Sequence, residues 1–393
     1  MGAMDLLRSR AVRIGAAAVL LIAIAGGGWL AFGGATPSPS PIAVATATPT
    51  PPVTPSATPS ATASPTPTAT PRATPHERPQ ATTVRCPLNG KTVTPRDRLK
   101  HPALAVQIEN HPLARPVRNL GLADMVVEAT VEGDVTRFTG IYLCRKTHGL
   151  IGPVRSGRYY SIDLWQDMHV LPFMFGSGAE GIQRYHAAHM PYINGITGNW
   201  PYFVRTSERP APHNLYTDLQ LVRNDFGNNP RLGAQVRRVG DLRPPFRFDR
   251  HADLPRGRRV RHVQFWTNSF WNFGWEWDRR LGAWRRNENG TEHIDAGTHR
   301  VLAAASVIVQ YVREDIVYGP HDPGGYPRRY HHLVGSGRAT LYVRGRAFAV
   351  HWSRPTALSR TRWTFVHGGK RVVLPPGVVW REILPVYTTV RER

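Results

Sequence analysis

The sequence predicts an α+β fold, with an N-terminal mixed α/β domain followed by a mainly β C-terminal domain. Over residues 84–235, short apolar runs alternate with segments of helical spacing. From residue 261 onward, aromatic and polar residues alternate, and glycine-rich turns separate the runs. The proline- and arginine-rich segment 236–260 separates the two patterns and is interpreted as a bridge. A length of 393 residues is sufficient for two domains.

In the N-terminal domain, apolar and polar residues alternate on both sides of Gly133, which predicts a β-hairpin. The interleaving of strands and helices there indicates α/β or α+β topology. The expected strands are 103–110, 125–133, 136–144 and 170–176, and the expected helices are 159–168 and 179–189.

The C-terminal domain opens with "VQFWTNSFWNFGWEWDRRLGAWRRNENG" at 263–290. Its aromatic residues can stack on sugar rings, but such alternation is more typical of cross-strand pairs in a core. We therefore expect the tryptophans to be core residues. Further strands are expected within 301–314, 339–354 and 362–386.

The first 32 residues predict a membrane segment. Residues 1–13 carry three arginines and form a basic cytoplasmic segment, and residues 14–32 contain no charge. That stretch approaches the roughly 20 residues of a spanning helix, with the positive charge on its cytoplasmic side. The alternative is a signal peptide cleaved near Gly33-Gly34-Ala35, which gives a secreted protein. Both interpretations place the bulk of the chain outside the cytoplasm.

Residues 36–80 consist almost entirely of Thr, Pro, Ser and Ala. Such a composition buries too little apolar surface to offset the entropy of ordering, so we expect a disordered linker. Proline favours extended polyproline II at about 3.1 Å per residue, so the linker reaches on the order of 100 Å. It is suited to spanning a cell wall.

The chain is strongly basic, with a formal net charge of +23. Nearly all of the positive charge is arginine, whose planar fork matches carboxylate and phosphate groups, and a basic surface concentrates anions. A general preference for arginine over lysine would give the same composition, so the charge alone identifies no partner. Nucleic acid is an unlikely partner outside the cytoplasm.

Cys86 and Cys144 are the two cysteines of the chain. An even pair outside the cytoplasm can form one disulfide, here between the start of the folded region and the end of a strand. Sequence does not supply the geometry that a disulfide requires, so the free form stays open.

Seven motifs occur in this order along the chain: "VQIENHPLARP" (106–116), "GLADMVVEATVEGDVTRFTGIY" (121–142), "IGPVRSGRYYSIDL" (151–164), "RPAPHNLYTD" (209–218), "SVIVQYV" (306–312), "GSGRATLYVRGRAFAVHW" (335–352) and "LPPGVVW" (374–380). In order and wording they resemble the DUF3048 family of YerB-like bacterial extracytoplasmic lipoproteins, over about residues 95–388. The resemblance implies a two-domain, surface-tethered extracytoplasmic protein, and it implies no established reaction. This chain has no lipidation cysteine near its N-terminus, which leaves the apolar helix as the anchor.

The motif "GPVRSGR" brings Arg155, Ser156 and Arg158 to the start of a predicted helix. Helix N-termini favour anions, and two arginines there can form forked hydrogen bonds with carboxylate or phosphate oxygens. The alternative is that both arginines pair with Asp163, Asp167 or other nearby acids.

Four residues are catalytic candidates: Glu128, Glu132, Ser177 and His213. Ser177 has the capping-box spacing to Glu180, which explains the serine without catalysis; as a nucleophile it needs a base such as His213.

Glu128 and Glu132 share one face of an extended strand, but four residues there span roughly 13 Å, too far for a glycosidase pair. A working partner would come from Glu109 or Asp124, oriented by Thr136 and Arg137. Structural pairing of Glu132 or Asp134 with Arg137 is the alternative.

The sequence contains no metal-binding or cofactor motif, so we expect no metal and no tightly bound cofactor. The first hypothesis is a tethered envelope protein that binds an anionic envelope polymer or a partner protein. The second is an extracytoplasmic hydrolase or transferase acting on wall glycan or phosphate-linked polymer. The expected ligand-binding residues are Asn110, Arg115, Asp124, Thr136, Arg137, Arg155, Ser156, Arg158 and Asn214.

Overall fold

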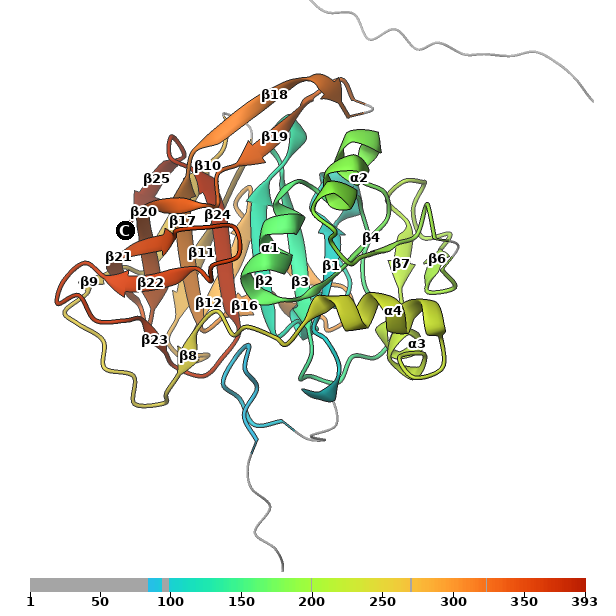
Figure 1. Ribbon diagram of the computed structural model, residues 1–393. Coiled ribbons are helices and arrows are strands. Elements are labelled where there is room, and N and C mark those ends of the chain that lie inside the picture. The colour runs from blue at the N-terminus through green and yellow to red at the C-terminus, as the bar shows by residue number, and fades with distance from the viewer. Residues whose placement is uncertain (1–83, 94–98, 199, 269–270, 323) are drawn as a thin grey trace, which may run out of the picture. The chain divides into compact units, whose positions relative to one another are not determined.

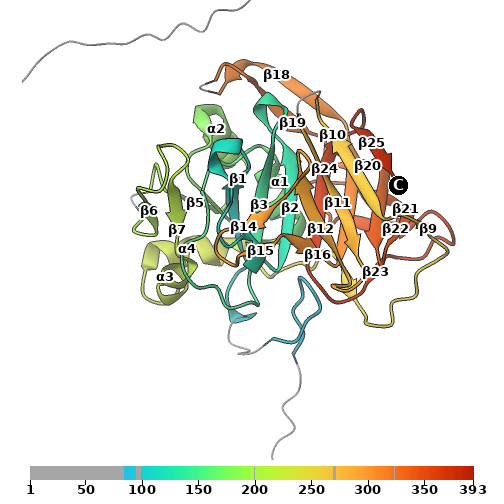
Figure 2. The same ribbon diagram turned by 180° about the vertical axis from the view of Figure 1, so that it is seen from behind.

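Two β-sheets packed face to face form the centre of the folded region (Figures 1 and 2). The computed structural model describes residues 84–93, 99–198, 200–268, 271–322 and 324–393. The basic segment 1–13, the apolar stretch 14–32 and the linker 36–80 lie outside the described residues. Among the described helices, none combines the length and the apolar character needed to cross a bilayer.

The larger sheet takes strands from both halves of the chain. Its central strand, β24 (Val379–Pro385), runs parallel to β2 (Met125–Thr130) on one side and to β17 (Ser306–Val312) on the other. Pairing of β24 with β2 therefore joins the two halves within one sheet. The order across this sheet is β22 (Arg362–Phe365), β21 (Arg346–Arg354), β20 (Gly335–Val343), β17, β24, β2, β3 (Thr136–Tyr142), β1 (Leu104–Glu109), β4 (Leu171–Met174) and β5 (Ile193–Asn194), with β9 (Arg258–Arg259) beside β21.

The smaller sheet contains the aromatic-rich segment. Trp275 and Trp284 are fully buried, and Trp275 contacts Trp380 of the larger sheet edge to face, with ring centroids 5.0 Å apart. The interpretation of these two tryptophans as core residues is confirmed. The sheet order is β13 (Thr291–Glu292), β12 (Ala283–Glu288), β11 (Asn272–Asp278), β10 (His262–Trp266) and β25 (Thr389–Glu392), with β16 (Ala303–Ala304) pairing β12.

Side chains of β24 alternate between the two faces of the larger sheet, as a strand requires. Trp380 belongs to the core between the sheets, and Ile383 to the core on the opposite face. Helix α1 (Tyr160–Met168) covers that opposite face (Figure 1), where Asp167 accepts a 2.9 Å hydrogen bond from Arg381.

The α+β prediction is confirmed, but two helices were not predicted. Helix α3 (Leu219–Asn224) is capped by the Asp218 side chain, and α4 (Pro230–Val239) by that of Asn229. Both have the N-cap residues that mark helix starts, and α4 also has proline at its first position. The other elements are α2 (Gly178–Ala187), the 3₁₀ turns η2 (Pro112–Ala114), η3 (Leu120–Leu122) and η4 (Glu132–Asp134), and the paired strands β6 (Phe203–Arg205) with β7 (Leu215–Thr217), β8 (Arg247–Phe248) with β23 (Val373–Leu374), β14 (Ile294–Asp295) with β15 (Arg300–Val301), and β18 (Glu314–His321) with β19 (Pro327–His331).

Candidate functional site

A pocket of about 280 Å³ lies where β1 ends and β3 begins. In the antiparallel pairing of these strands Glu109 lies opposite Arg137, so the end of one strand meets the start of the other. The turn η4 and the β18–β19 hairpin complete the wall. We call it the arginine pocket; it is lined by Glu109, Asn110, His111, Glu132, Gly133, Val135, Thr136, Arg137, Arg155, Asp322, Gly324 and Tyr326.

Five of the predicted site residues line the arginine pocket: Asn110, Glu132, Thr136, Arg137 and Arg155. Arg155 reaches it because its segment forms a short extension of the sheet, in which its amide donates to Gln107 and its carbonyl accepts from Phe175. Backbone pairing on both sides thus fixes the position from which this side chain projects.

Glu109 connects two of the predicted basic residues. Its Oε1 lies 3.1 Å from Nε of Arg155, and its Oε2 lies 3.1 Å from Nδ1 of His213. The His213 ring stacks on His111, with centroids 5.1 Å apart. Burial lowers the pKa of His111, Glu109 opposes that shift, and His213 and nearby arginines add to it. From the sequence, Glu109 was named only as a possible partner, and His111 was not singled out. Glu109 is the last residue of the buried strand β1, and His111 follows it by two positions.

Glu132 forms ion pairs with two arginines. Its Oε2 accepts from Nε of Arg158 at 2.8 Å, and its Oε1 accepts from Nη1 of Arg328 at 2.7 Å. Burial alone would raise the pKa of Glu132, but Arg158, Arg137 and Arg328 outweigh it and lower the pKa to about 2. Glu132 is therefore ionised at neutral pH and has no proton to donate as a general acid.

We expect acid to destabilise the protein partly through Glu132. The pKa of this carboxyl is about 2 when folded, against 4.5 for the unperturbed group, so its contribution is complete above pH 4.5 and is lost as the pH falls through 2. The difference between the folded and the unperturbed pKa corresponds to at most roughly 3 kcal/mol in the free energy of unfolding. Urea unfolding at several pH values should show a flatter dependence below pH 4.5 for Glu132→Gln than for the exposed control Glu276→Gln. Equal slopes would contradict the assignment.

Arg137 is the cation of the pocket that lacks a carboxylate partner. It is 6 % exposed, its Nη1 donates to the carbonyl of Ser156 at 3.0 Å, and its buried Nε has no hydrogen-bond partner. Within the described part of the chain, no carboxylate forms an ion pair with it. Burial lowers the pKa of Arg137 to about 9, helped by Arg158 and opposed by Glu132. The side chain stays charged at neutral pH, and a buried cation without a partner is costly.

Arg158 does not have the role expected from its place before a helix. Its guanidinium binds Glu132 and the carbonyls of Ser156 and Gly157. The alternative, pairing with Asp163, Asp167 or another nearby acid, is realised through another acid, Glu132, because Asp163 and Asp167 bind Arg354 and Arg381. The partner is instead an acid that lies in η4.

Glu128 lies between the two sheets and does not line the arginine pocket. It is fully buried and accepts hydrogen bonds from Thr136 at 2.6 Å, Arg286 at 2.6 Å and Trp380 at 2.9 Å. The assumed strand spacing between Glu128 and Glu132 does not apply, because β2 ends at Thr130 and Glu132 begins η4.

Ser177 precedes α2, but its hydroxyl does not cap the helix. It donates to the carbonyl of Gly157 at 3.1 Å and bonds Tyr185 Oη at 2.8 Å. The capping-box prediction is therefore wrong in its hydrogen bonds, because the hydroxyl ties α2 to the loop before α1. No hydrogen bond joins Ser177 to His213 among the described residues.

Four other predicted residues lie outside the lining. Ser156 contributes its carbonyl to Arg137 and Arg158, and Asn214 bonds Arg205 and the carbonyl of Thr206. Asp124 is a structural acceptor beside the disulfide, and Arg115 lines a second pocket.

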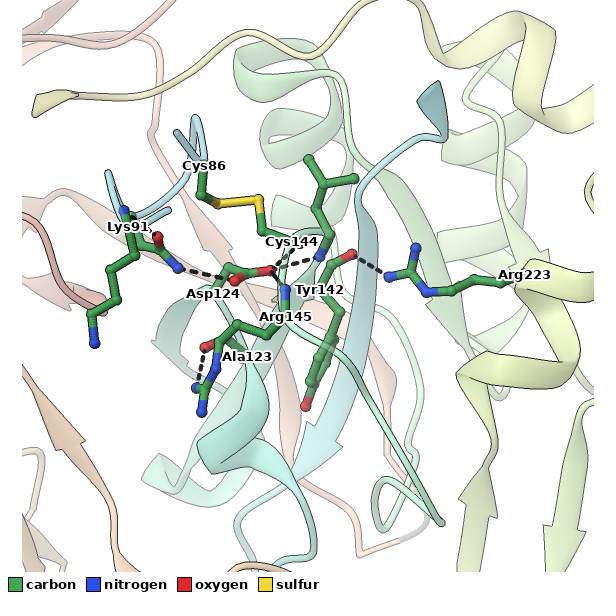
Figure 3. The surroundings of a disulfide bond; sticks show 10 residues. Cys86, Lys91, Ala123, Asp124, Tyr142, Cys144, Arg145 and Arg223 are labelled. Carbon is green, nitrogen blue, oxygen red and sulfur yellow. Dashed lines mark hydrogen bonds between the residues drawn. A yellow bond between two sulfur atoms is a disulfide. The ribbon is translucent and has the colours of Figure 1, made fainter. Parts of the chain in front are cut away.

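The predicted disulfide between Cys86 and Cys144 is present, with an S–S distance of 2.11 Å (Figure 3). Next to it, Asp124 accepts hydrogen bonds from the amides of Leu143 and Cys144 and from the side chain of Asn89. The ligand atoms of Cys86, Asp124 and Cys144 lie within 4.8 Å of one another. This is not a thiolate metal site, since the sulfurs are bonded to each other.

Two domains described as parts of a protein of unknown function (DUF3048) match this chain: the N-terminal domain over residues 88–231 and the C-terminal domain over residues 261–380. A relative named "Putative lipoprotein YerB", from Bacillus subtilis (strain 168), is 25% identical over 307 residues, covering 78% of this chain and 87% of the relative. The crystal structure of the YerB protein from Bacillus subtilis has a TM-score of 0.64 at 23% identity, covering 78% of this chain and 99% of that one, and it supports the fold.

Proposed function

The chain belongs to the DUF3048 family, and from that premise we propose that it is an envelope protein, located outside the cytoplasm, that binds an anionic polymer in the arginine pocket. The lipoprotein name of its Bacillus relative supports a membrane-associated place outside the cytoplasm. In this chain, the apolar stretch 14–32 is the proposed anchor and 36–80 the spacer. The basic composition favours a polyanion over a neutral glycan.

The observation that carries the proposal is the uncompensated charge of Arg137. Its neighbour Arg158 is neutralised by Glu132, whereas Arg137 has no carboxylate partner among the described residues and keeps a buried donor unused. Arg155, with 28% of its side chain exposed, shares its acid partner, Glu109, with His213. A carboxylate or phosphate entering the pocket would accept a hydrogen bond from the unused Nε of Arg137 and would also neutralise its charge.

A polymer is favoured over a free ion by the surroundings of the pocket. Tyr326 lines it and is 54% exposed, and Tyr318 on the same hairpin is 78% exposed. Exposed aromatic faces of this kind can stack on sugar rings. The proposed ligand is therefore a glycan or related polymer bearing carboxylate or phosphate groups.

We expect Arg137→Met to weaken wall binding without loss of stability, because it removes a cation that the folded protein buries without a partner. In a pelleting assay with purified cell wall, the soluble fragment from residue 84 onward should lose about tenfold or more in affinity, the worth of a charged hydrogen bond. Its midpoint of urea unfolding should stay equal or rise. Affinity of the unchanged protein should fall as salt is added.

The matched control is Arg158→Met, which leaves Glu132 without its closest partner and should destabilise the fold. Retention of wall binding by Arg137→Met, or an affinity that does not change with salt, would contradict the proposal. Binding to extracted envelope proteins, but not to protein-free wall, would indicate a partner protein instead.

The second candidate is a hydrolase or transferase acting on wall glycan or phosphate-linked polymer. It is favoured by the Glu109–His213 pair, in which the carboxylate can orient the imidazole as a general base. Release of soluble wall fragments, lost in His213→Gln, would support catalysis; pelleting without release favours binding alone.

A further inference from the structure

A second pocket, of about 390 Å³, lies beside the turn from β12 to β13. It is lined by Arg115, Pro116, Glu288 and residues 291–294, and it shares no lining residue with the arginine pocket. Asn110 lies between the two, donating from Nδ2 to Thr136 Oγ1 and to Glu288 Oε1 at 2.8 Å each. A volume of this size suits a small organic molecule.

The Arg115 side chain is held in place, but one edge of its guanidinium group makes no hydrogen bond. Its guanidinium carbon lies 4.7 Å from the ring centroid of Trp271, and its Nη1 lies 3.7 Å from Oε2 of Glu288. Arg209 donates to the carbonyls of Ala114 and Pro116, which fixes the backbone on both sides of Arg115. Nε and Nη2 of Arg115 are buried without partners. These two donors form one edge of the guanidinium, the geometry that binds a carboxylate in bidentate fashion.

His293 adds an independent observation on the same pocket. It is 4% exposed, its Nδ1 lies 2.9 Å from Oε2 of Glu288, and its Nε2 has no hydrogen-bond partner. Burial lowers the pKa of His293, although Glu288 opposes the shift, so the ring is neutral at neutral pH. A buried polar atom without a partner calls for a ligand group or ordered water.

The other lining residues select the class of ligand. Glu288 and Glu292 are acidic, so a dianion such as phosphate would be repelled more strongly than a monoanion. Pro116 and Ile294, the latter 47% exposed, offer apolar contact. A monoanion with an apolar body matches both features.

We propose that this second pocket binds a small monocarboxylate, whose two oxygens accept from the Nε–Nη2 edge of Arg115 and whose apolar body packs against Pro116 and Ile294. The site is separate from the arginine pocket and does not rest on the function proposed for it.

The test uses butyrate as the probe and observes the imidazole ¹⁵N resonances of His293, identified through His293→Gln. Butyrate should shift them saturably, whereas butyramide, of the same shape without charge, should not. Arg115→Lys keeps the charge but loses the fork, and it should weaken butyrate about tenfold. Ile294→Asp, at an exposed position, adds a negative charge at the pocket and should also weaken butyrate binding.

Arg155→Gln is the matched control, because it changes the arginine pocket alone and should leave the butyrate response intact. Equal responses to butyrate and butyramide, tighter binding of inorganic phosphate, or an unchanged response in both Arg115→Lys and Ile294→Asp would overturn the proposal. Wall pelleting by Arg115→Lys should stay normal, so the two proposals can fail separately.

Discussion

Replacing Arg286 with methionine is expected to destabilise the protein by about 3 to 5 kcal/mol, the usual cost of breaking a buried ion pair by removing one partner. Arg286 is fully buried, donates to Glu128 at 2.6 Å and lies 3.7 Å from Glu288. Without Arg286, the carboxylates of Glu128, Glu288 and the nearby Glu382 would be buried close together without the cation that they interact with. Urea unfolding at pH 7 measures the loss.

The loss should be larger at pH 8 than at pH 5. Burial already raises the pKa of Glu128 against the pull of Arg286; without that arginine the folded pKa rises further above the unfolded value. An acid with a raised folded pKa loses stability as the pH increases. The exposed control Arg313→Met should change stability by less than about 0.5 kcal/mol. Adding Glu128→Gln to Arg286→Met should recover part of the loss, and purely additive effects would show that the pair is not coupled.

Removal of the disulfide is expected to cost about 2 to 4 kcal/mol. The bond closes a loop of 58 residues between Cys86 and Cys144, and cross-links of this length restrict the unfolded chain by roughly 4 kcal/mol in the chain-entropy account. The double variant Cys86→Ala with Cys144→Ala should therefore unfold at lower urea concentration than the unchanged protein.

A reducing agent supplies the control for this comparison. It should shift the midpoint of the unchanged protein toward that of the double variant and leave the variant itself unaffected. If thiol titration shows full reduction and the midpoint does not move, the bond contributes nothing to stability.

Local patterns in the sequence were enough to predict many of the elements. Alternation around Gly133 predicted β2 and β3. The aromatic run predicted β structure with its tryptophans in the core, and it contains most of β10 to β12, with Trp275 and Trp284 buried. Such patterns work because one face of each strand must be buried. They carry no information on which distant strands pair, so the insertion of β24 between β2 and β17 could not be predicted.

In the candidate site too, the sequence marked single residues but not the pairs that they form in the fold. Thr136 and Arg137 were placed just past the predicted turn, and they begin β3. Asn110 was named as ligand-binding without a structural argument, and the arginine motif marked Arg155. The pairing of Arg158 with Glu132, and of His213 with Glu109 across 104 positions, is created by the fold. Sequence therefore indicated a basic recess but not that Arg137 is its uncompensated cation.

The position of β24 also determines when the protein can fold. This strand occupies the middle of the large sheet, yet it is made of residues 379–385, close to the end of the chain. Until those residues have been synthesised, β2 and β17 each expose an unpaired edge that invites aggregation. Completion of the large sheet therefore requires residues 379–385, and a chain that stops short of residue 379 would lack the strand that unites its two halves.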